Sequence, residues 1–269
     1  MKTLLKVLSM LVLISVLLLS SCIAEDLPVS DSAEQSKENV MPDVIMAQMD
    51  SYLAAKTGDK LNFSFFAISK RKNAITSRNI TQISFGCDDV VAIEYWKMME
   101  GYEDGYHYES LWTYLIFKKE GNYVFDKVTI SYKDGTSEVF PIGRCSIQVF
   151  DDDDCDVLFT YGTAQASSAV DELDCDYRKD AHHVSYAGFD LDLEAEYEVV
   201  NVTEDAYSIY IGIEFTSDKT PAYRYILPRI RVKVDGVEDY VYPKVGCSCG
   251  ELVMTVKRFI DAYKAWNFN

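Results

Sequence analysis

Four consecutive carboxylates, Asp151, Asp152, Asp153 and Asp154, with Asp156 close behind, are the densest group of potential metal ligands in this 269-residue chain. Calcium prefers several hard oxygen ligands supplied by one short loop. Neighbouring carboxylates diverge, however, and this run lacks the alternating spacing and the glycine that aim successive oxygens at one centre. The pattern therefore favours a solvated linker over a calcium site, and no other cofactor is expected.

Residues suited to acid–base or nucleophilic chemistry are sparse. The sequence holds no Gly-x-Ser-x-Gly elbow, no His-Glu-x-x-His helix, no phosphate-binding loop and no dinucleotide fingerprint. Its histidines are His107, His182 and His183, and the adjacent pair would point to opposite faces of a strand. Paired carboxylates are recognised by their separation in space, which a sequence does not show. A non-enzymatic protein is the first interpretation, and a polysaccharide-active enzyme or accessory protein that uses paired carboxylates is the alternative.

Aromatic side chains crowd the stretch between residues 96 and 114, around a turn rich in glycine and acidic residues at 101–105. Aromatic faces on an exposed turn can stack on a sugar ring or anchor a protein partner. The alternative is that these rings belong to the core, as the spacing of Trp112 and Tyr114 on one strand face indicates. The predicted binding residues are Trp96, Tyr102, Tyr106 and Tyr108.

Seven cysteines are present, and six of them lie beyond the first 22 residues. In an oxidising compartment an even number of cysteines favours disulfides. The predicted bridges are Cys87–Cys145, Cys175–Cys247 and Cys155–Cys249. Six free thiols are the main alternative, and a zinc site built on Cys247 and Cys249 is a weaker one because no second close pair completes it.

The first 22 residues form a leader. Lys2 and Lys6 precede an apolar run over residues 7–19, which ends in Leu19-Ser20-Ser21-Cys22. The run is short for a transmembrane helix, and its end is typical of a cleaved secretion signal. Leu-Ser-Ser-Cys resembles the lipobox of bacterial lipoproteins. The resemblance implies cleavage before Cys22, lipidation of that residue with palmitate among the acyl chains, and a membrane anchor outside the cytoplasm. Ile23 after the cysteine favours the outer membrane or cell surface.

The charge of the chain excludes some partners. Cleavage would remove residues 1–21, with two lysines and no acidic residue, so the formal net charge would change from -17 to -19. Nucleic acids and anionic lipid surfaces require an excess of Lys and Arg. Neither nucleic acid nor a charge-driven membrane contact is therefore expected, and the lipid anchor remains the predicted route to the membrane.

The elements that would position these residues are mostly strands. An apolar stripe predicts a short helix over residues 44–56. Period-two patterns predict strands, and an ambiguous segment at 252–259 is assigned to a final strand rather than a helix. The other strands are expected at residues 61–68, 80–85, 90–99, 111–117, 123–132, 189–195 and 209–215.

Two Asp-Gly pairs, at residues 134–135 and 235–236, predict hairpin turns. Each is followed by an aromatic-Pro pair, a glycine and a cysteine, at Cys145 and Cys247, which indicates an internal repeat. The fold class predicted is all-β, with two tandem antiparallel β-sandwich domains of immunoglobulin-like type and one short N-terminal helix. The expected boundaries are residues 1–21 for the signal peptide, 22–42 for a disordered tether, 43–150 for the first domain and 151–269 for the second.

Together these patterns predict a membrane-tethered extracytoplasmic lipoprotein. Its expected role is that of a binding or adhesion module for an unknown protein or glycan ligand.

Overall fold

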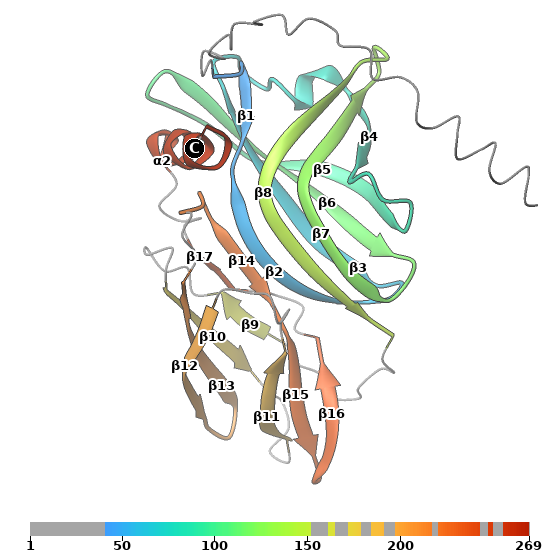
Figure 1. Cartoon of the computed structure of the whole chain (residues 1–269), viewed down its shortest axis with the longest axis vertical. Helices are drawn as coiled ribbons and strands as arrows, with labels where there is room; N and C mark the ends of the chain where they lie inside the picture. Colours follow the sequence, from blue (N-terminus) through green and yellow to red (C-terminus); the bar gives the residue numbers. More distant parts are fainter. Residues whose placement is uncertain are drawn as a thin grey trace, which may run out of the picture. The chain divides into compact units, whose positions relative to one another are not determined.

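Strands dominate the computed structural model, which describes residues 41–151, 161–164, 172–178, 184–190, 197–216, 220–242, 247–249 and 255–268 (Figure 1). The elements in chain order are β1 (Val44–Met46), β2 (Met49–Lys56), β3 (Lys60–Ser69), the 3-10 turn η1 (Thr76–Arg78), β4 (Ile80–Ser84), β5 (Val90–Glu103), β6 (Tyr106–Phe117), β7 (Gly121–Tyr132), β8 (Ser137–Phe150), β9 (Tyr161–Ala164), β10 (Glu172–Arg178), β11 (Val184–Asp190), β12 (Tyr197–Glu204), β13 (Ser208–Phe215), β14 (Arg224–Leu227), β15 (Arg229–Val234), β16 (Val237–Val241), β17 (Cys247–Cys249) and the helix α2 (Val256–Asn267).

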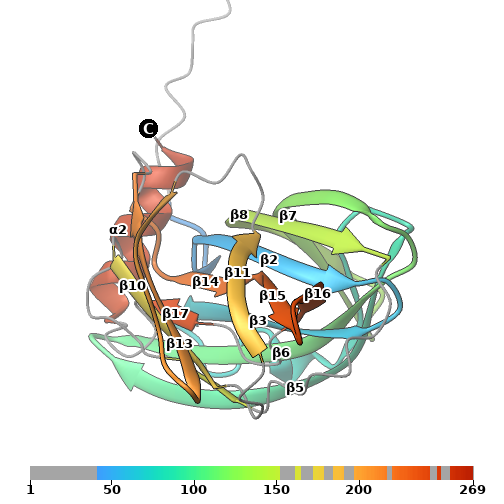
Figure 2. The same ribbon diagram turned by 90° about the horizontal axis from the view of Figure 1, so that it is seen from below.

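Two sheets enclose the larger hydrophobic core. One has the order β1-β3-β6-β5 and the other the order β17-β14-β2-β8-β7-β4, and Figure 2 shows β3, β6 and β5 in one layer with β2, β8 and β7 in the next. Aromatic rings join the layers: Phe85 lies 5.6 Å from Phe63 of β3 and 4.8 Å from Phe125 of β7. Alternate residues point into this core from Leu61 to Phe65 in β3 and from Val128 to Tyr132 in β7, as the period-two pattern predicts.

The predicted helix at residues 44–56 is wrong, because this segment forms β1 and β2. β2 runs parallel to both β8 and β14 and is buried from Met49 to Ala55. Both faces of β2 are covered, since Met49 and Leu53 belong to the larger core and Tyr52 to a second core in the C-terminal half, so β2 shows no period-two alternation. Without that alternation, periodicity alone cannot distinguish this strand from a helix, because Ile45, Met49, Tyr52 and Leu53 also fall at helical spacing.

Most of the predicted strands are confirmed. β3, β4, β5, β6 and β7 cover residues 61–68, 80–84, 90–99, 111–117 and 123–132, and β13 covers 209–215. The turn between β15 and β16 is a two-residue loop in which Asp235 and Gly236 both have positive φ, as a type I′ turn requires. The turn at Asp134 is longer than predicted, because β7 ends at Tyr132 and β8 begins at Ser137.

A second core lies in the C-terminal half, between the sheets β12-β13-β10-β9 and β11-β15-β16. Its members include Ile211 of β13 and Val232 of β15, together with Tyr52 of β2 and Ile226 of β14. β14 and β17 pair within the sheet of β2 and β8, so this sheet crosses the expected boundary at residues 150 and 151. Residues 41–269 cluster as one compact unit, and two tandem sandwiches are not confirmed.

The two copies of the predicted repeat differ in structure after their Asp-Gly turns. Cys145 lies within β8, in the same strand that follows the first turn, whereas Cys247 begins β17, a separate strand that pairs with β14. The shared Asp-Gly pair therefore produces turns of different length in different sheets.

The C-terminal segment is a helix, so the predicted final strand is wrong for the residues from 256 onward. Thr255 caps α2, since its hydroxyl oxygen accepts a hydrogen bond of 3.3 Å from the backbone N–H of Arg258. Val256, Phe259 and Tyr263 form the buried stripe. Figure 1 shows α2 in red beside β1, and Phe259 lies 6.5 Å from the Phe66 ring of β3. The helix, which was the alternative for this ambiguous segment, agrees with the spacing of these apolar residues.

The predicted Cys87–Cys145 bridge is not present, because both cysteines are free. Cys145 is fully buried in β8 opposite Phe125, and burial raises the pKa of its thiol. Cys87 lies in the turn before β5, where its carbonyl accepts a hydrogen bond from Val90. The Cys145 side chain points from β8 into the core and packs there as a small apolar group. Cys155 lies outside the described residues, as do the side chains of Cys175, Cys247 and Cys249.

Candidate binding site

The long hairpin of β5 and β6 carries the predicted aromatic residues. Its strands pair from Val90 opposite Phe117 to Glu103 opposite Tyr106. The connection is the two-residue turn Asp104-Gly105, in which both residues have positive φ, so the hairpin is tight to its tip. The predicted loop at residues 101–105 is therefore mostly strand, and cross-strand pairing fixes the directions of its tyrosines.

A hollow of about 230 Å³ lies at the tip of this hairpin. Tyr102 is 66% exposed, and its ring lies 4.7 Å from that of His107, its partner across the strands. The two rings are tilted by 50° to each other, and the Tyr102 ring is open to solvent. The residues that line the hollow are Lys72, Asn73, Glu100, Gly101, Tyr102, His107 and Tyr108.

Polar groups also line the hollow. Lys97 Nζ donates to Glu100 Oε2 at 2.5 Å and to Asn73 Oδ1 at 3.2 Å, and Lys72 Nζ lies 3.8 Å from Glu100 Oε1. The hydrogen bond from Lys97, with the charges of Lys72 and Lys97, lowers the pKa of Glu100. Glu100 is therefore an ionised hydrogen-bond acceptor at neutral pH, beside an exposed aromatic face. An aromatic platform with a few convergent polar groups suits a ligand that has both a flat apolar face and hydroxyl or amide donors.

Tyr108 is held by a glycine on the neighbouring strand. A Cβ built on Gly101 would lie 2.1 Å from the Cζ atom of Tyr108, so only glycine leaves room for this ring. Gly101 and Tyr108 are direct partners across the hairpin. This close approach half-buries Tyr108 at the edge of the hollow.

Trp96 and Tyr106 lie away from the tip hollow. The Trp96 ring is 6.4 Å from that of Trp112 and 5.0 Å from that of Tyr114, in a row along the middle of the hairpin. Tyr106 is half-buried, with Lys70 Nζ 6.0 Å from its ring centre. The structure therefore brings together Tyr102 and Tyr108 of the four predicted binding residues and separates the other two.

Sequence reasoning missed Lys72, Asn73, Glu100 and His107. Lys72 and Asn73 belong to the turn that follows β3, about thirty residues before the hairpin tip. Only the pairing of β3 with β6 brings that turn beside the hairpin. The single local signal was the Asp104-Gly105 pair, which could have located the turn and hence the pairing of Tyr102 with His107.

The predicted calcium ligands can be placed only in part. Asp151 is exposed at the end of β8, and Asp152, Asp153, Asp154 and Asp156 lie outside the described residues. Among the described residues no group of three His, Cys, Asp or Glu side chains could hold a metal ion.

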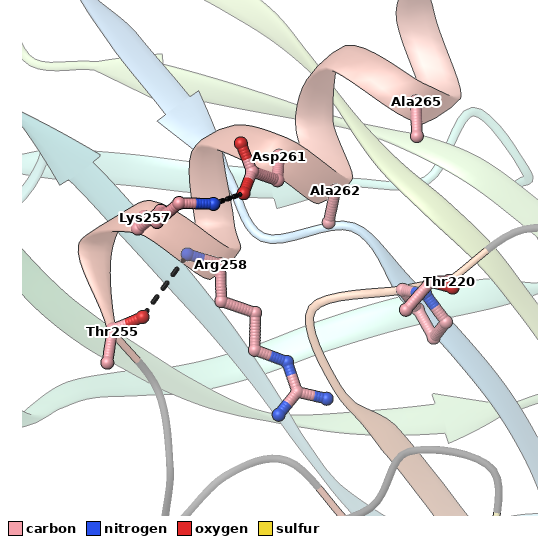
Figure 3. Close-up of a pocket in the computed structure, with 8 residues that line it drawn as sticks. Thr220, Thr255, Lys257, Arg258, Asp261, Ala262 and Ala265 are labelled. Carbon is pink, nitrogen blue, oxygen red and sulfur yellow. Dashed lines mark hydrogen bonds and ion pairs between the residues drawn. The ribbon is translucent and has the colours of Figure 1, made fainter.

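A second hollow, of about 430 Å³, lies along α2 (Figure 3). Lys257 forms an ion pair with Asp261 on the exposed face, and Thr220 lies across from Ala262. The lining contains no aromatic side chain and none of the residues predicted to bind a ligand or a metal. It does not resemble a recognition site as closely as the hairpin tip does.

No protein-family model matches this sequence, and a search of curated proteins finds no relative. Solved structures that resemble it include the human desmocollin-1 ectodomain, at 16% identity and a TM-score of 0.24 over 75% of this chain. The chain spans about a third of that ectodomain, 36% of its length. A protein of unknown function from Porphyromonas gingivalis W83 is 9% identical, with a TM-score of 0.22 over 77% of this chain and 99% of that one. A chimeric titin Z1Z2 is 7% identical, with a TM-score of 0.21 over 77% of this chain and 96% of that one. At such TM-scores these likenesses carry no conclusion about function.

Proposed function

We propose that this chain is a lipid-anchored, extracytoplasmic binding module that holds a protein or glycan ligand at the tip of the hairpin β5–β6. The observation that carries the proposal is the tip hollow, which is lined by the exposed ring of Tyr102 and by the ionised Glu100. Exposed aromatic side chains of this kind dominate binding energy at many recognition surfaces. The β-sheet framework holds the ring in place through the cross-strand pairing with His107.

Anchoring through Cys22 supports this role. The leader and the lipobox-like motif end at Cys22, and several acyl chains on one residue hold a protein firmly to a bilayer. No helix among the described residues is long and apolar enough to cross a membrane. A lipid anchor would leave the ligand-binding hairpin outside the cytoplasm.

Cys22→Ser should abolish lipidation, because only a cysteine thiol can form the thioether. Cells grown with radiolabelled palmitate should incorporate label into the wild-type protein and none into the variant. Cys87→Ser is the matched control, since it removes a different free cysteine, and it should remain labelled. Wild-type protein without label would rule out the lipoprotein assignment.

Tyr102→Ala should remove ligand binding with little effect on folding. Its side chain is mostly exposed, so the free energy of unfolding should change by about 0.5 kcal/mol or less. Binding of the full-length protein in detergent can be measured on a printed array of glycans and purified extracellular-matrix proteins. A signal on the array that falls at least tenfold in this variant would support the hairpin tip.

Tyr207→Ala is the matched control for that experiment. Tyr207 is 62% exposed and lies in the turn between β12 and β13, away from the hairpin in the sheet order. The Tyr207→Ala variant should bind the array as the wild-type protein does. Equal binding by the Tyr102 variant, or a loss of stability of several kcal/mol, would contradict the proposal.

The alternative function is a polysaccharide-active enzyme that uses paired carboxylates, but no specific observation favours such an enzyme. Among the described residues the buried carboxylates are Asp50 and Glu109. Asp50 pairs with Arg224, and Glu109 accepts hydrogen bonds from the N–H of Ile75 at 2.9 Å and the hydroxyl of Thr76 at 2.6 Å. Both are engaged in structural contacts, and neither lines the tip hollow.

A further inference from the structure

A cleft of about 480 Å³ lies at the other end of the hairpin, where the strands β2, β3, β6 and β14 come together. Its volume is within the range of roughly 300–1,000 Å³ that is usual for small-molecule sites. Residues far apart in the sequence line it, so no sequence pattern points to it. They include Asn62 of β3 and the tyrosines Tyr114, Tyr225 and Tyr242.

Three tyrosines from different elements meet at this cleft. Tyr114 belongs to β6, Tyr225 to β14, and Tyr242 follows β16. All three side chains are half-buried, so each has one part fixed by packing and another part open. The Tyr114 ring also lies 5.0 Å from that of Trp96, so the aromatic row of the hairpin leads into the cleft. Aromatic faces of this kind pack against the C–H faces of sugar rings.

Asn62 supplies a polar group without a partner. Its side-chain oxygen is buried and accepts no hydrogen bond within the described part of the chain. A buried carbonyl oxygen that is unpaired destabilises the folded protein, so such groups are rare without a reason. Asn62 is the direct partner of Tyr114 across β3 and β6, which places the amide beside an aromatic wall of the cleft. Rotation of the amide would let a ligand hydroxyl pair with it.

The charges around the cleft nearly cancel. Lys60 Nζ lies 3.1 Å from Glu94 and 5.0 Å from the centre of the Tyr114 ring. The remaining charged residues in the lining are Lys56 and Asp59, which have opposite signs. A site without excess charge suits a neutral ligand better than a phosphate or a carboxylate.

We propose that this cleft is a second binding site, which takes a neutral saccharide. Tyrosine faces pack against the sugar rings, and Asn62 exchanges hydrogen bonds with a hydroxyl group. The inference is independent of the hairpin tip, which lies at the opposite end of β5 and β6. The cleft and the tip would then engage different ligands or different parts of one chain of sugars.

Isothermal titration of the full-length protein in detergent tests this site, with maltohexaose, cellohexaose and mannohexaose as separate probes. We expect at least one probe to bind with a Kd of 1 mM or tighter. Asn62→Leu should weaken that binding at least tenfold. It should leave the melting temperature unchanged or raise it, since the substitution removes the unpaired oxygen. A merely structural asparagine would instead lower the melting temperature when it is replaced.

Two further variants keep the test decisive. Tyr242→Ala should weaken binding of the same probe tenfold, and it serves if the Asn62 variant does not fold. Tyr207→Ala should bind the probe as the wild type does, because Tyr207 is exposed and lines neither the cleft nor the tip hollow. The proposal is overturned when none of the three probes binds, or when the variants at 62 and 242 both keep full affinity. Loss in the Tyr102 variant alone would also overturn it, and would assign the sugar to the hairpin tip.

Discussion

Gly143→Ala should lower the free energy of unfolding by about 3 kcal/mol or more, one of the two largest effects expected here. Gly143 has φ +85°, a conformation that L side chains rarely adopt. An added Cβ would also lie 2.2 Å from the carbonyl oxygen of Met49 and 2.7 Å from its nitrogen. Both are backbone atoms of a buried strand, in direct register with Gly143 across the parallel pair of β2 and β8. Relief of the clash would require these strands to separate.

Gly135→Ala is the matched control for Gly143. Gly135 has nearly the same φ, +83°, but nothing lies within 4 Å of an added Cβ. This variant should therefore lose only the conformational term of about 1–2 kcal/mol. Urea denaturation of both variants separates the clash from the backbone strain. Equal losses at the two positions would show that β2 and β8 can move apart easily, contrary to the expectation.

Breaking the buried ion pair between Asp50 and Arg224 should have a comparable effect. Asp50 lies on β2 and Arg224 on β14, and their side chains are 2% and 0% exposed. Arg224 also lies over the Phe215 ring, 4.1 Å from its centre. Asp50→Ala removes a carboxylate that pairs with a fully buried guanidinium, so it should lower the free energy of unfolding by about 3–5 kcal/mol. Urea denaturation measures this loss.

The double variant Asp50→Leu with Arg224→Met tests whether charge or packing matters. Apolar residues of similar volume often replace a buried ion pair with little loss, so this variant should be clearly more stable than Asp50→Ala. Lys257→Ala is the control at a surface pair, where Lys257 and Asp261 are 79% and 54% exposed. It should change stability by less than about 1 kcal/mol. A loss for Asp50→Ala as small as that of the surface control would refute the structural role of the pair.

The Asp50–Arg224 pair links residues on the two sides of the expected domain boundary. The pair joins a strand of the N-terminal half to a strand of the C-terminal half, beside the parallel pairing of Tyr52 with Ile226. Burial, followed by the nearby charge of Asp50, raises the pKa of Tyr52. An ion pair between residues 50 and 224 leaves no local pattern, since its partners are 174 residues apart.

Local sequence patterns determined the strands that have one buried face. In β7 the alternation of Val128, Ile130 and Tyr132 with polar residues predicted both the strand and the face it buries, and the structure confirms them. The Asp235-Gly236 turn was likewise predictable, because only a few residue types tolerate positive φ at both positions. Such features depend on neighbours within a few residues, which a sequence displays directly.

The tertiary structure alone decided β2, α2 and the candidate site. β2 is buried on both faces because its side chains belong to two different cores, which leaves no period-two pattern. Helical spacing was visible in the α2 segment, but the packing of Phe259 near Phe66 decided between helix and strand. The aromatic residues of the hairpin could be named from the sequence, and Tyr102 and Tyr108 do reach the tip hollow. The sequence could not identify Lys72, Asn73 or the cleft around Asn62, because strand pairing brings these side chains together over long sequence distances. Composition and local spacing determine which residues can bind, whereas the register of distant strands determines which of them meet.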